Sequence, residues 1–381
     1  MLPDKTQTKE QERSLSLIIA GGGTGGHLFP GIAVAEEVMA VHADNRVRFI
    51  GTGNPFETRI LGHRGFEHHH IRVKHLKGKS IFRQITALAA IPKSIAASVG
   101  ILRTTRPNVV LGVGGYSAGP VVLAAWMLGI PRALHEQNVI PGMTNRMLSA
   151  FADRIYVSFE GTRLKAGRNK LVLTGNPVRH TIRPALEDST FSKTASWTPQ
   201  NPFTVFIVGG SQGAHRINTT VMAALAYIKF KDNMAFIHQT GAADEHDVAK
   251  AYGDHHVAAT VKPFFNQMEK HYRKADLVIC RAGASTIAEL AVLGKCVLFI
   301  PYPFAADDHQ AANARQFVSA GAAEMILEKD LTAQGLAQTI TSYASSHQKR
   351  RSMAENIRKL ARPEAAHTIV EDLYKLSNAK D

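Results

Sequence analysis

One pattern occurs twice along the chain: an apolar segment, a glycine-rich turn and a segment of helical periodicity. In the first half the apolar segment is 15–20, the turn is 21–26 and the helical pattern covers about 30–40. In the second half the strand-like segment is 204–208 and the turn is 209–213. Further apolar runs alternate with helical patterns, which predicts parallel sheets joined by crossover helices. We therefore expect an α/β protein with two Rossmann-like domains whose parallel sheets face a central cleft.

The chain is long enough for two domains, because its 381 residues exceed the usual size of one. A polar stretch rich in proline and serine between Pro177 and Pro202 has the composition of a linker. The first residues are polar and charged and lack the apolar core of a signal peptide. The expected divisions are a disordered lead at 1–14, an N-terminal domain at 15–178, a linker at 179–201, a C-terminal domain at 202–350 and a C-terminal helix at 351–381 that could return to the N-terminal domain.

The charge and cysteine content limit the class of protein. The formal net charge of +14 indicates anionic partners, such as nucleic acid, phosphorylated substrates or an acidic membrane surface. The two cysteines, Cys280 and Cys296, lie in or beside apolar runs, which favours buried free thiols in a reducing compartment. The longest apolar stretch, near 121–130, is too short for a membrane span of about 20 residues. These features predict a cytoplasmic protein that could attach peripherally to a membrane.

The first glycine-rich turn formally fits G-x-G-x-x-G through Gly21, Gly23 and Gly26. Glycines at such positions let the backbone approach a phosphate. A dinucleotide-binding domain would also need an acidic residue about 20 residues later, at the end of the next strand. The next apolar run, 47–50, ends in Gly-Thr-Gly, which disfavours that class. A phosphate-binding turn and a tight turn without a ligand remain as alternatives.

His27 directly follows this turn, near the expected start of a helix. An imidazole titrates near neutral pH, so it could accept a proton from a hydroxyl nucleophile. A histidine at a helix start could equally do no more than hydrogen-bond the backbone. Its position alone leaves both interpretations open.

Further candidate residues follow other predicted strands. The second glycine-rich loop, 112–119, could contact an anion or could only let a helix pack close to its strand. The polar residues 135–138 (HEQN) could hydrogen-bond sugar hydroxyls. In the second half, Ser211 and Gly213 could hold a phosphate, and Glu289 could accept two vicinal ribose hydroxyls. The alternative for Glu289 is a carboxylate favoured by the helix dipole near a helix start.

Two clusters contain residue types that bind metals, but we expect no metal site. The segment 307–310 (DDHQ) has no second set of ligands that converges on it in the sequence, and the segment 67–70 (EHHH) only looks like a metal-binding tag. We interpret 67–70 as a polar edge strand. We also expect no cofactor.

A basic segment with interleaved apolar residues covers 72–106. This composition suits an anionic bilayer surface, and the part at 74–95 is the candidate membrane contact. An amphipathic helix packed on its own domain is the alternative for the apolar residues. Nucleic acid is not expected as a partner, because the chain has no recognisable nucleic-acid module and no aromatic stacking platform.

Taken together, the motifs are far more specific than any one of them. Their combination resembles the MurG family of bacterial N-acetylglucosaminyltransferases, from about Leu15 to the C-terminal region. The motifs that carry the resemblance occur in this order: GGGTGGHLFPG at 21–31, GVGGYSAGP at 112–120, HEQN at 135–138, GNPVR at 175–179, GGSQGA at 209–214, RAGASTIAE at 281–289 and DHQAANA at 308–314.

The resemblance implies a GT-B fold and an inverting reaction. N-acetylglucosamine would pass from UDP-GlcNAc to the 4-hydroxyl of the MurNAc-pentapeptide on undecaprenyl diphosphate (lipid I), forming lipid II in peptidoglycan synthesis. The acceptor would be bound mainly by the N-terminal domain and the nucleotide sugar mainly by the C-terminal one. The chain has no Asp-x-Asp motif, which disfavours the metal-dependent single-domain type of glycosyltransferase.

The resemblance also assigns roles to residues. His27 matches the family's candidate general base. Phe265 stands where relatives often have isoleucine and meet uracil through the backbone. The other residues implied in substrate binding are Thr24, Gly25, Gly26, Asn138, Arg179, Ser211, Ala284, Ser285, Thr286, Ile287, Ala288, Glu289 and Gln310.

Further partners implied are an anionic membrane surface and other cell-wall synthesis proteins, with the chain peripheral on the cytoplasmic face of the bacterial inner membrane. Three other interpretations stay open. The chain could be an epimerase or a different glycosyltransferase on the same fold, since fold does not determine function. It could also be a nucleotide-binding or membrane-scaffold module without turnover.

Overall fold

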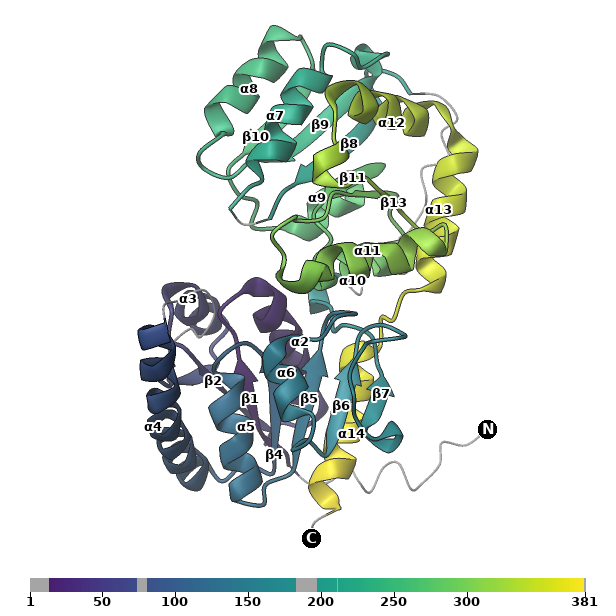
Figure 1. The fold of residues 1–381 in the computed structure, drawn as a ribbon. Coiled ribbons are helices and arrows are strands. Elements are labelled where there is room, and N and C mark those ends of the chain that lie inside the picture. The colour runs from purple at the N-terminus through teal and green to yellow at the C-terminus, as the bar shows by residue number, and fades with distance from the viewer. Residues whose placement is uncertain (1–13, 74–80, 183–196, 211, 380–381) are drawn as a thin grey trace, which may run out of the picture. The chain divides into compact units, whose positions relative to one another are not determined.

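The structure is a computed structural model that describes residues 14–73, 81–182, 197–210 and 212–379; within 81–90 it describes the backbone only. The chain divides into two compact units (Figure 1). Unit 1 comprises Met1–His180 and Arg362–Asp381, and unit 2 comprises Thr181–Ala361. Across the described residues, no helix is both long enough and apolar enough to cross a membrane.

Unit 1 is built on a seven-stranded parallel sheet with the order β3-β2-β1-β4-β5-β6-β7. The central strands β1 and β4 are nearly continuous apolar runs because helices cover both faces of the sheet. The strands are β1 (Ser16–Gly21), β2 (Arg46–Gly51), β3 (Glu67–His70), β4 (Val109–Gly114), β5 (Arg132–Glu136), β6 (Arg154–Val157) and β7 (Leu171–Leu173). The strand order reverses between β1 and β4, and ligands of open α/β sheets bind at the carboxyl side of such a switch point. The polar edge strand predicted at 67–70 is confirmed as β3, which lies at the end of the sheet beside β2.

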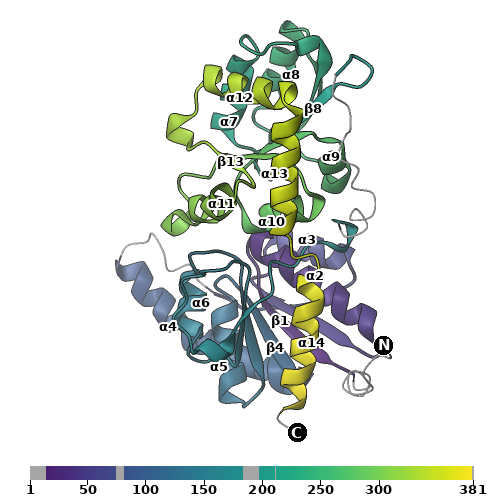
Figure 2. The same cartoon turned by 90° about the vertical axis from the view of Figure 1, so that its right-hand side faces the viewer.

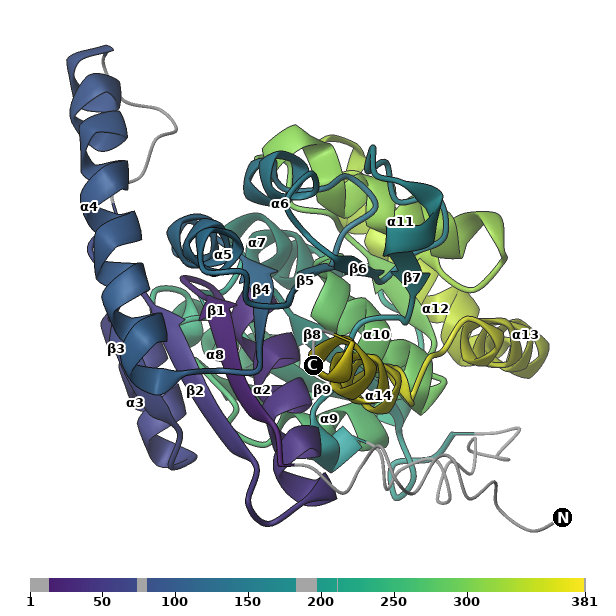
Figure 3. The same ribbon diagram turned by 90° about the horizontal axis from the view of Figure 1, so that it is seen from below.

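The helices of unit 1 pack on both faces of this sheet, as Figure 3 shows. They are α2 (Gly25–Val41), α3 (Pro55–His63), α4 (Ile81–Thr105), α5 (Ala118–Met127), α6 (Met143–Leu148) and α14 (Ala365–Asn378). One core cluster joins α2 and α14 to the sheet through side chains such as Ile32 and Ile369. The other joins α4 and α5 to the opposite face through side chains such as Leu102 and Val121.

Two helix boundaries differ from the sequence prediction. Helix α2 begins at Gly25 rather than near Pro30, so Gly26 and His27 belong to its first turn. The glycines suggested a turn, but glycine destabilises a helix mainly in its middle, so it is tolerated in the first turn. The single helix expected at the C-terminus is two helices, α13 (His347–Lys359) and α14, with Pro363 between them. A proline has no amide hydrogen to continue the first helix. Helix α14 packs beside α2 in unit 1 (Figure 2).

Unit 2 repeats the architecture with six parallel strands in the order β10-β9-β8-β11-β12-β13. The strands are β8 (Phe203–Val208), β9 (Met234–Gln239), β10 (Ala258–Lys262), β11 (Leu277–Cys280), β12 (Val297–Phe299) and β13 (Glu324–Met325). The helices besides α13 are α7 (His215–Ala224), α8 (Glu245–Asp254), α9 (Met268–Lys274), α10 (Ala284–Leu293), α11 (His309–Ser319) and α12 (Ala333–Ser345). The order reverses between β8 and β11, which places the switch point of this unit beside the second glycine-rich turn.

Candidate active site

The two glycine-rich loops of unit 1 pack against each other at the switch point between β1 and β4. A Cβ atom on Gly21 would overlap the carbonyl oxygen of Gly114, and one on Gly115 would lie 2.7 Å from the carbonyl oxygen of Gly22. Both glycines have positive φ angles, 138° and 81°. Close packing of the two loops therefore accounts for the glycines at 21 and 115 without an anion, which is a different packing from the helix-against-strand contact expected for the loop at 112–119.

His27 is held on this pair of loops. Its Nδ1 lies 3.2 Å from Oγ1 of Thr24, the residue that precedes α2. A Cβ atom on Gly114 would lie 2.8 Å from Cδ2 of the imidazole, so only glycine leaves room for the ring there. In the tautomer whose Nδ1–H donates to Thr24, Nε2 carries the lone pair and can act as a base. Gly25 and Gly26 complete this first helical turn, in which Gly26 and Thr24 are exposed.

The HEQN segment at 135–138 is largely structural. Burial lowers the pKa of His135 to about 4, so this imidazole is neutral at neutral pH. The buried Gln137 donates from Nε2 to the carbonyl of Val113 at 2.8 Å. The buried Glu136 accepts hydrogen bonds from the Asn138 and Gly142 amides at 2.9 and 3.1 Å. Of the four side chains expected to contact a sugar, only Asn138 is not fully buried, so it is the one that remains a candidate.

Arg179 lies in unit 1, near the start of α2. Its guanidinium carbon is 5.7 Å from the ring centroid of Phe29, two residues after His27. The side chain is half-buried. A guanidinium there adds positive charge close to the first helical turn, where helix amides also favour an anion.

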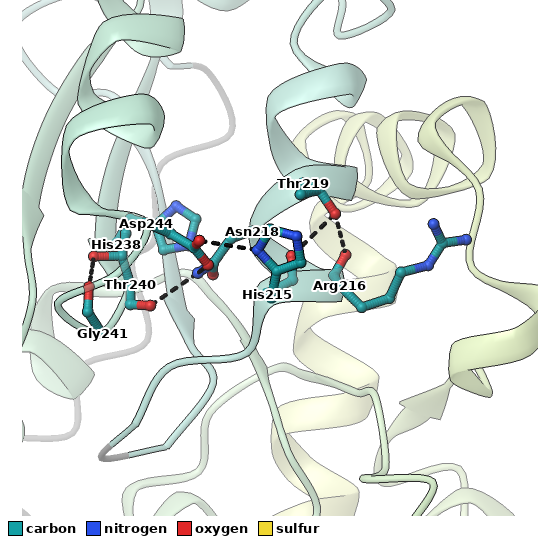
Figure 4. A network of polar contacts seen from close by, with 8 residues as sticks. All are labelled: His215, Arg216, Asn218, Thr219, His238, Thr240, Gly241 and Asp244. Atoms are coloured by element: carbon teal, nitrogen blue, oxygen red, sulfur yellow. Dashed lines mark hydrogen bonds and ion pairs between the residues drawn. The ribbon is translucent and has the colours of Figure 1, made fainter.

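In unit 2, the start of α7 is fixed by a polar network that Figure 4 shows. Asn218 Nδ2 donates to the carbonyl of Thr240 at 2.8 Å and to Asp244 at 2.7 Å. His215, the first residue of α7, pairs with Asp244 at 2.9 Å. His238 is buried beside Asn218, and burial lowers its pKa to about 3. The network ties the helix start after the second glycine-rich turn to the end of β9.

The glycine-rich turn itself also contacts the end of β9. A Cβ atom on Gly213 would overlap the carbonyl of Thr240, so Gly213 is required for this packing. Ser211, the expected phosphate contact, lies outside the described residues.

Gln239, the last residue of β9, connects the turn to the segment expected to bind uracil. Its Nε2 donates to the carbonyl of Gly210 at 2.9 Å, and its Oε1 accepts from the amide of Phe265 at 2.9 Å. The ring of Phe265 is buried against His271, with 4.1 Å between ring centroids. The Phe265 amide donates to Gln239, so the Phe265 carbonyl is the backbone group that could contact uracil.

Given the uracil contact that the family resemblance implies at Phe265, replacing Gln239 with alanine is expected to raise the Kd for UDP about tenfold. The change removes two hydrogen bonds that set the turn and the Phe265 backbone relative to each other, and each is worth about 1 kcal/mol. Isothermal titration with UDP measures the effect. The control is Gln338→Ala on the exposed face of α12, and equal affinities for the two variants would contradict the role of Gln239.

Helix α10 carries the largest group of candidate residues. Gly283 precedes the helix, and Ala284, Ser285 and Thr286 form its first turn. The side chain of Ile287 is buried and its amide donates to the carbonyl of Gly283 at 3.0 Å, while Ala288 is half-buried.

Glu289 is only 6% exposed and lies in the second turn of α10. The helix dipole therefore does not explain a carboxylate at this position, since its effect is confined to the first turn.

Gln310 opens α11 together with His309. Its Oε1 accepts from the amide of Tyr302 at 3.0 Å, which leaves its Nε2 as the donor of the side chain. His309 Nδ1 bonds the carbonyl of Ala306 at 2.8 Å. Over the described ranges, no three histidine, cysteine or acidic side chains are grouped as metal ligands would be.

Comparison with known proteins identifies the family. Residues 17–157 match the glycosyltransferase family 28 N-terminal domain, and residues 204–369 match the C-terminal domain of that family. A relative from Myxococcus xanthus (strain DK1622) is 44% identical over 358 residues, which cover 94% of this chain and 92% of the relative. One from Geotalea daltonii is 44% identical over 361 residues, covering 94% and 97%. Both are named UDP-N-acetylglucosamine–N-acetylmuramyl-(pentapeptide) pyrophosphoryl-undecaprenol N-acetylglucosamine transferase.

Solved structures agree with this result. MurG of Acinetobacter baumannii is 31% identical with a TM-score of 0.76, and the match covers 95% of this chain and 99% of that one. UDP-GlcNAc 2-epimerase from Neisseria meningitidis has a TM-score of 0.67 at 16% identity, covering 94% and 99%, and so shares the fold alone. The predicted GT-B fold of two Rossmann-like domains is confirmed. The chain belongs to the family of UDP-N-acetylglucosamine–N-acetylmuramyl-(pentapeptide) pyrophosphoryl-undecaprenol N-acetylglucosamine transferases, within glycosyltransferase family 28.

Proposed function

We propose that this chain transfers N-acetylglucosamine from UDP-GlcNAc to the 4-hydroxyl of the MurNAc-pentapeptide of lipid I, with inversion, and so forms lipid II. The observation that carries the proposal is the identity of 44% over 94% of the chain with transferases named for this reaction. The local geometry of both units is compatible with it. Each unit has a glycine-rich turn and polar side chains at the carboxyl ends of its strands.

On the acceptor side, His27 is the proposed general base. As the acceptor oxygen attacks the anomeric carbon, its proton passes to Nε2 of the imidazole. Thr24 and Gly114 hold the ring, so the lone pair is oriented before the substrate arrives. Thr24, Gly25, Gly26 and Asn138 would contact the nucleotide-sugar donor near this base.

On the donor side, the bond between the anomeric carbon and the diphosphate oxygen breaks, and its electron pair leaves with UDP. We propose that the helix starts of α7 and α10 stabilise this charge through amides of the second glycine-rich turn and of residues 284–286. Arg179 supplies a positive charge in the same role. Glu289 accepts the ribose hydroxyls, the Phe265 backbone contacts uracil, and Gln310 contacts the sugar.

A product assay tests the proposal directly. Incubating the protein with UDP-GlcNAc and a lipid I analogue should yield one disaccharide product with a β linkage and one UDP per transfer. An epimerised nucleotide sugar, or UDP release without transfer, would instead favour the epimerase alternative. Tight UDP-GlcNAc binding with no turnover would favour a binding module.

We propose further that the chain works peripherally on the cytoplasmic face of an anionic membrane, where lipid I would be presented. The exposed Lys93 and Arg103 of α4 support this, and so do the exposed Trp126 and Met127 at the end of α5. Ile95 packs on the core of unit 1, so it does not contribute to such a surface. The side chains of residues 74–90 lie outside those that the structure describes. Cell-wall synthesis proteins as partners rest on the family resemblance alone.

Replacing Lys77, Lys79 and Lys93 together with alanine is expected to weaken binding to anionic vesicles about a hundredfold at low salt. Each basic residue near such a surface contributes about 1 kcal/mol. Co-sedimentation with vesicles containing phosphatidylglycerol measures the effect. The matched control removes three exposed lysines of unit 2, Lys270, Lys274 and Lys329. Equal losses in the two variants would show that only net charge matters and would refute a defined contact surface.

A further inference from the structure

Glu57 is a buried carboxylate whose partners come from the first glycine-rich turn and from the end of β2. It is the third residue of α3 and only 2% exposed. One oxygen, Oε1, accepts from the amide of Gly23. The other, Oε2, accepts from the amides of Thr52 and Gly53, both at 2.9 Å, and from the Thr52 hydroxyl at 3.0 Å. Four neutral donors thus converge on one carboxylate, which is the arrangement expected around a bound anion.

The surrounding residues leave room for this side chain and fix it. A Cβ atom on Gly22 would overlap Oε1, so this glycine allows the close approach. Asn54 caps α3 by accepting from the Glu57 amide at 2.9 Å, and its Nδ2 donates to the Thr52 hydroxyl at 3.2 Å. Because the Thr52 hydroxyl receives that bond, its own hydrogen is directed to Glu57.

The donors and the acid occupy opposite positions from those in a dinucleotide-binding domain. There, the turn amides face a ligand phosphate and an acid at the end of the second strand binds a ribose. Here the end of β2 supplies donors at Thr52 and Gly53, and the acid comes from α3 and occupies the amide of Gly23. A ligand phosphate cannot use that amide while Glu57 does.

We propose that Glu57 is a positioning residue for the transfer reaction. Its carboxylate takes the place of a ligand anion at Gly23 and thereby fixes the turn that leads into Thr24 and His27. Gly23 immediately precedes Thr24, so a shift of the turn would change the position of the imidazole on Gly114. The kinetic part of this inference rests on the proposed function, but the placement of the turn does not.

Two variants separate the charge of Glu57 from its shape. Glu57→Gln keeps the shape, but in either orientation its NH2 group faces a backbone donor. Glu57→Asp is shorter but still accepts hydrogen bonds. We expect kcat to fall about tenfold to a hundredfold in Glu57→Gln, as is typical when a reacting group is displaced by about 1 Å. We expect a smaller fall in Glu57→Asp and a Kd for UDP within about twofold of wild type in both. A higher kcat in Glu57→Gln than in Glu57→Asp would overturn the proposal.

The control and a second readout keep the test independent of folding and of the activity. Asp372→Asn removes another acid of unit 1, one that accepts from Tyr156 at 2.9 Å and pairs with Arg154. This variant should keep kcat within about twofold. In Glu57→Gln the one remaining oxygen should stay with the three donors of Thr52 and Gly53, which turns the NH2 group toward Gly23. Amide hydrogen exchange of the peptide covering 21–27 should therefore be about tenfold faster in Glu57→Gln, because Gly23 loses its acceptor, and unchanged in Asp372→Asn. Unchanged exchange in Glu57→Gln would refute the positioning role even if wild type showed no transfer. Absent wild-type transfer together with faster exchange would refute only the proposed function.

Discussion

Replacing His27 with alanine is expected to lower kcat about 100- to 10,000-fold, the usual contribution of a general base. Without an acceptor for its proton, the attacking hydroxyl would have to react as a neutral nucleophile. UDP binding should stay within about twofold, because the proposed UDP contacts lie mainly in unit 2. Steady-state transfer with a lipid I analogue gives kcat, and isothermal titration gives the affinity for UDP.

A second histidine of unit 1 provides the control. His63, in the last turn of α3, is exposed, and His63→Ala should keep kcat within about twofold. If His27→Ala turned over nearly as fast as wild type, His27 would not be the base and its contact with Thr24 would be structural only. A large loss of UDP affinity in His27→Ala would instead show that the side chain contributes to donor binding.

The fold could be predicted from the sequence because parallel strands covered on both faces are short apolar runs between helical patterns. Both glycine-rich turns follow the first strand of their sheets, where the strand order reverses. The start of α2 was less predictable. Gly25 and Gly26 are poor helix formers, and only the packing of the helix behind them, at residues such as Ile32 and Val38, places them in its first turn.

The supporting residues of the site could not be predicted, because their roles depend on partners that are distant in sequence. Glu57 is 34 residues from Gly23, and Gln239 is 29 residues from Gly210 and 26 from Phe265. The only local signal for Glu57 is its place in the first turn of a helix, which is common for acidic residues. A polar residue at a strand end, such as Gln239, carries the same weak signal whether it binds a ligand or a neighbouring loop.

Burial was the second property that the sequence did not reveal. Residues 135–138 are all polar and follow an apolar strand, so they suggested a ligand site. The structure buries His135, Glu136 and Gln137 and uses them to hold nearby loops. The desolvation of a polar side chain is acceptable when hydrogen bonds replace water, and this compensation is visible only in three dimensions.

Replacing Glu289 with alanine is expected to raise the Kd for UDP about a hundredfold. Glu289 is 6% exposed in the second turn of α10, and its carboxylate is proposed to accept both ribose hydroxyls. A hydrogen bond to a charged acceptor contributes about 1.5–3 kcal/mol, so the loss of two accounts for an effect of this size. Glu289→Gln keeps one acceptor oxygen and should raise the Kd about tenfold. Isothermal titration with UDP measures both values.

Glu289 is buried, so Glu289→Ala could weaken UDP binding through a general loss of packing. Comparing two ligands that differ by one ribose hydroxyl separates this effect from the loss of a ribose contact. Wild type should bind 2′-deoxy-UDP about tenfold more weakly than UDP, since one hydroxyl is missing. In Glu289→Ala the two ligands should bind equally, because the acceptor of that hydroxyl is gone. A general packing defect would weaken both ligands and preserve their ratio. If Glu289→Ala still preferred UDP tenfold, the carboxylate would not contact the ribose, and its effect on affinity would come from the placement of α10.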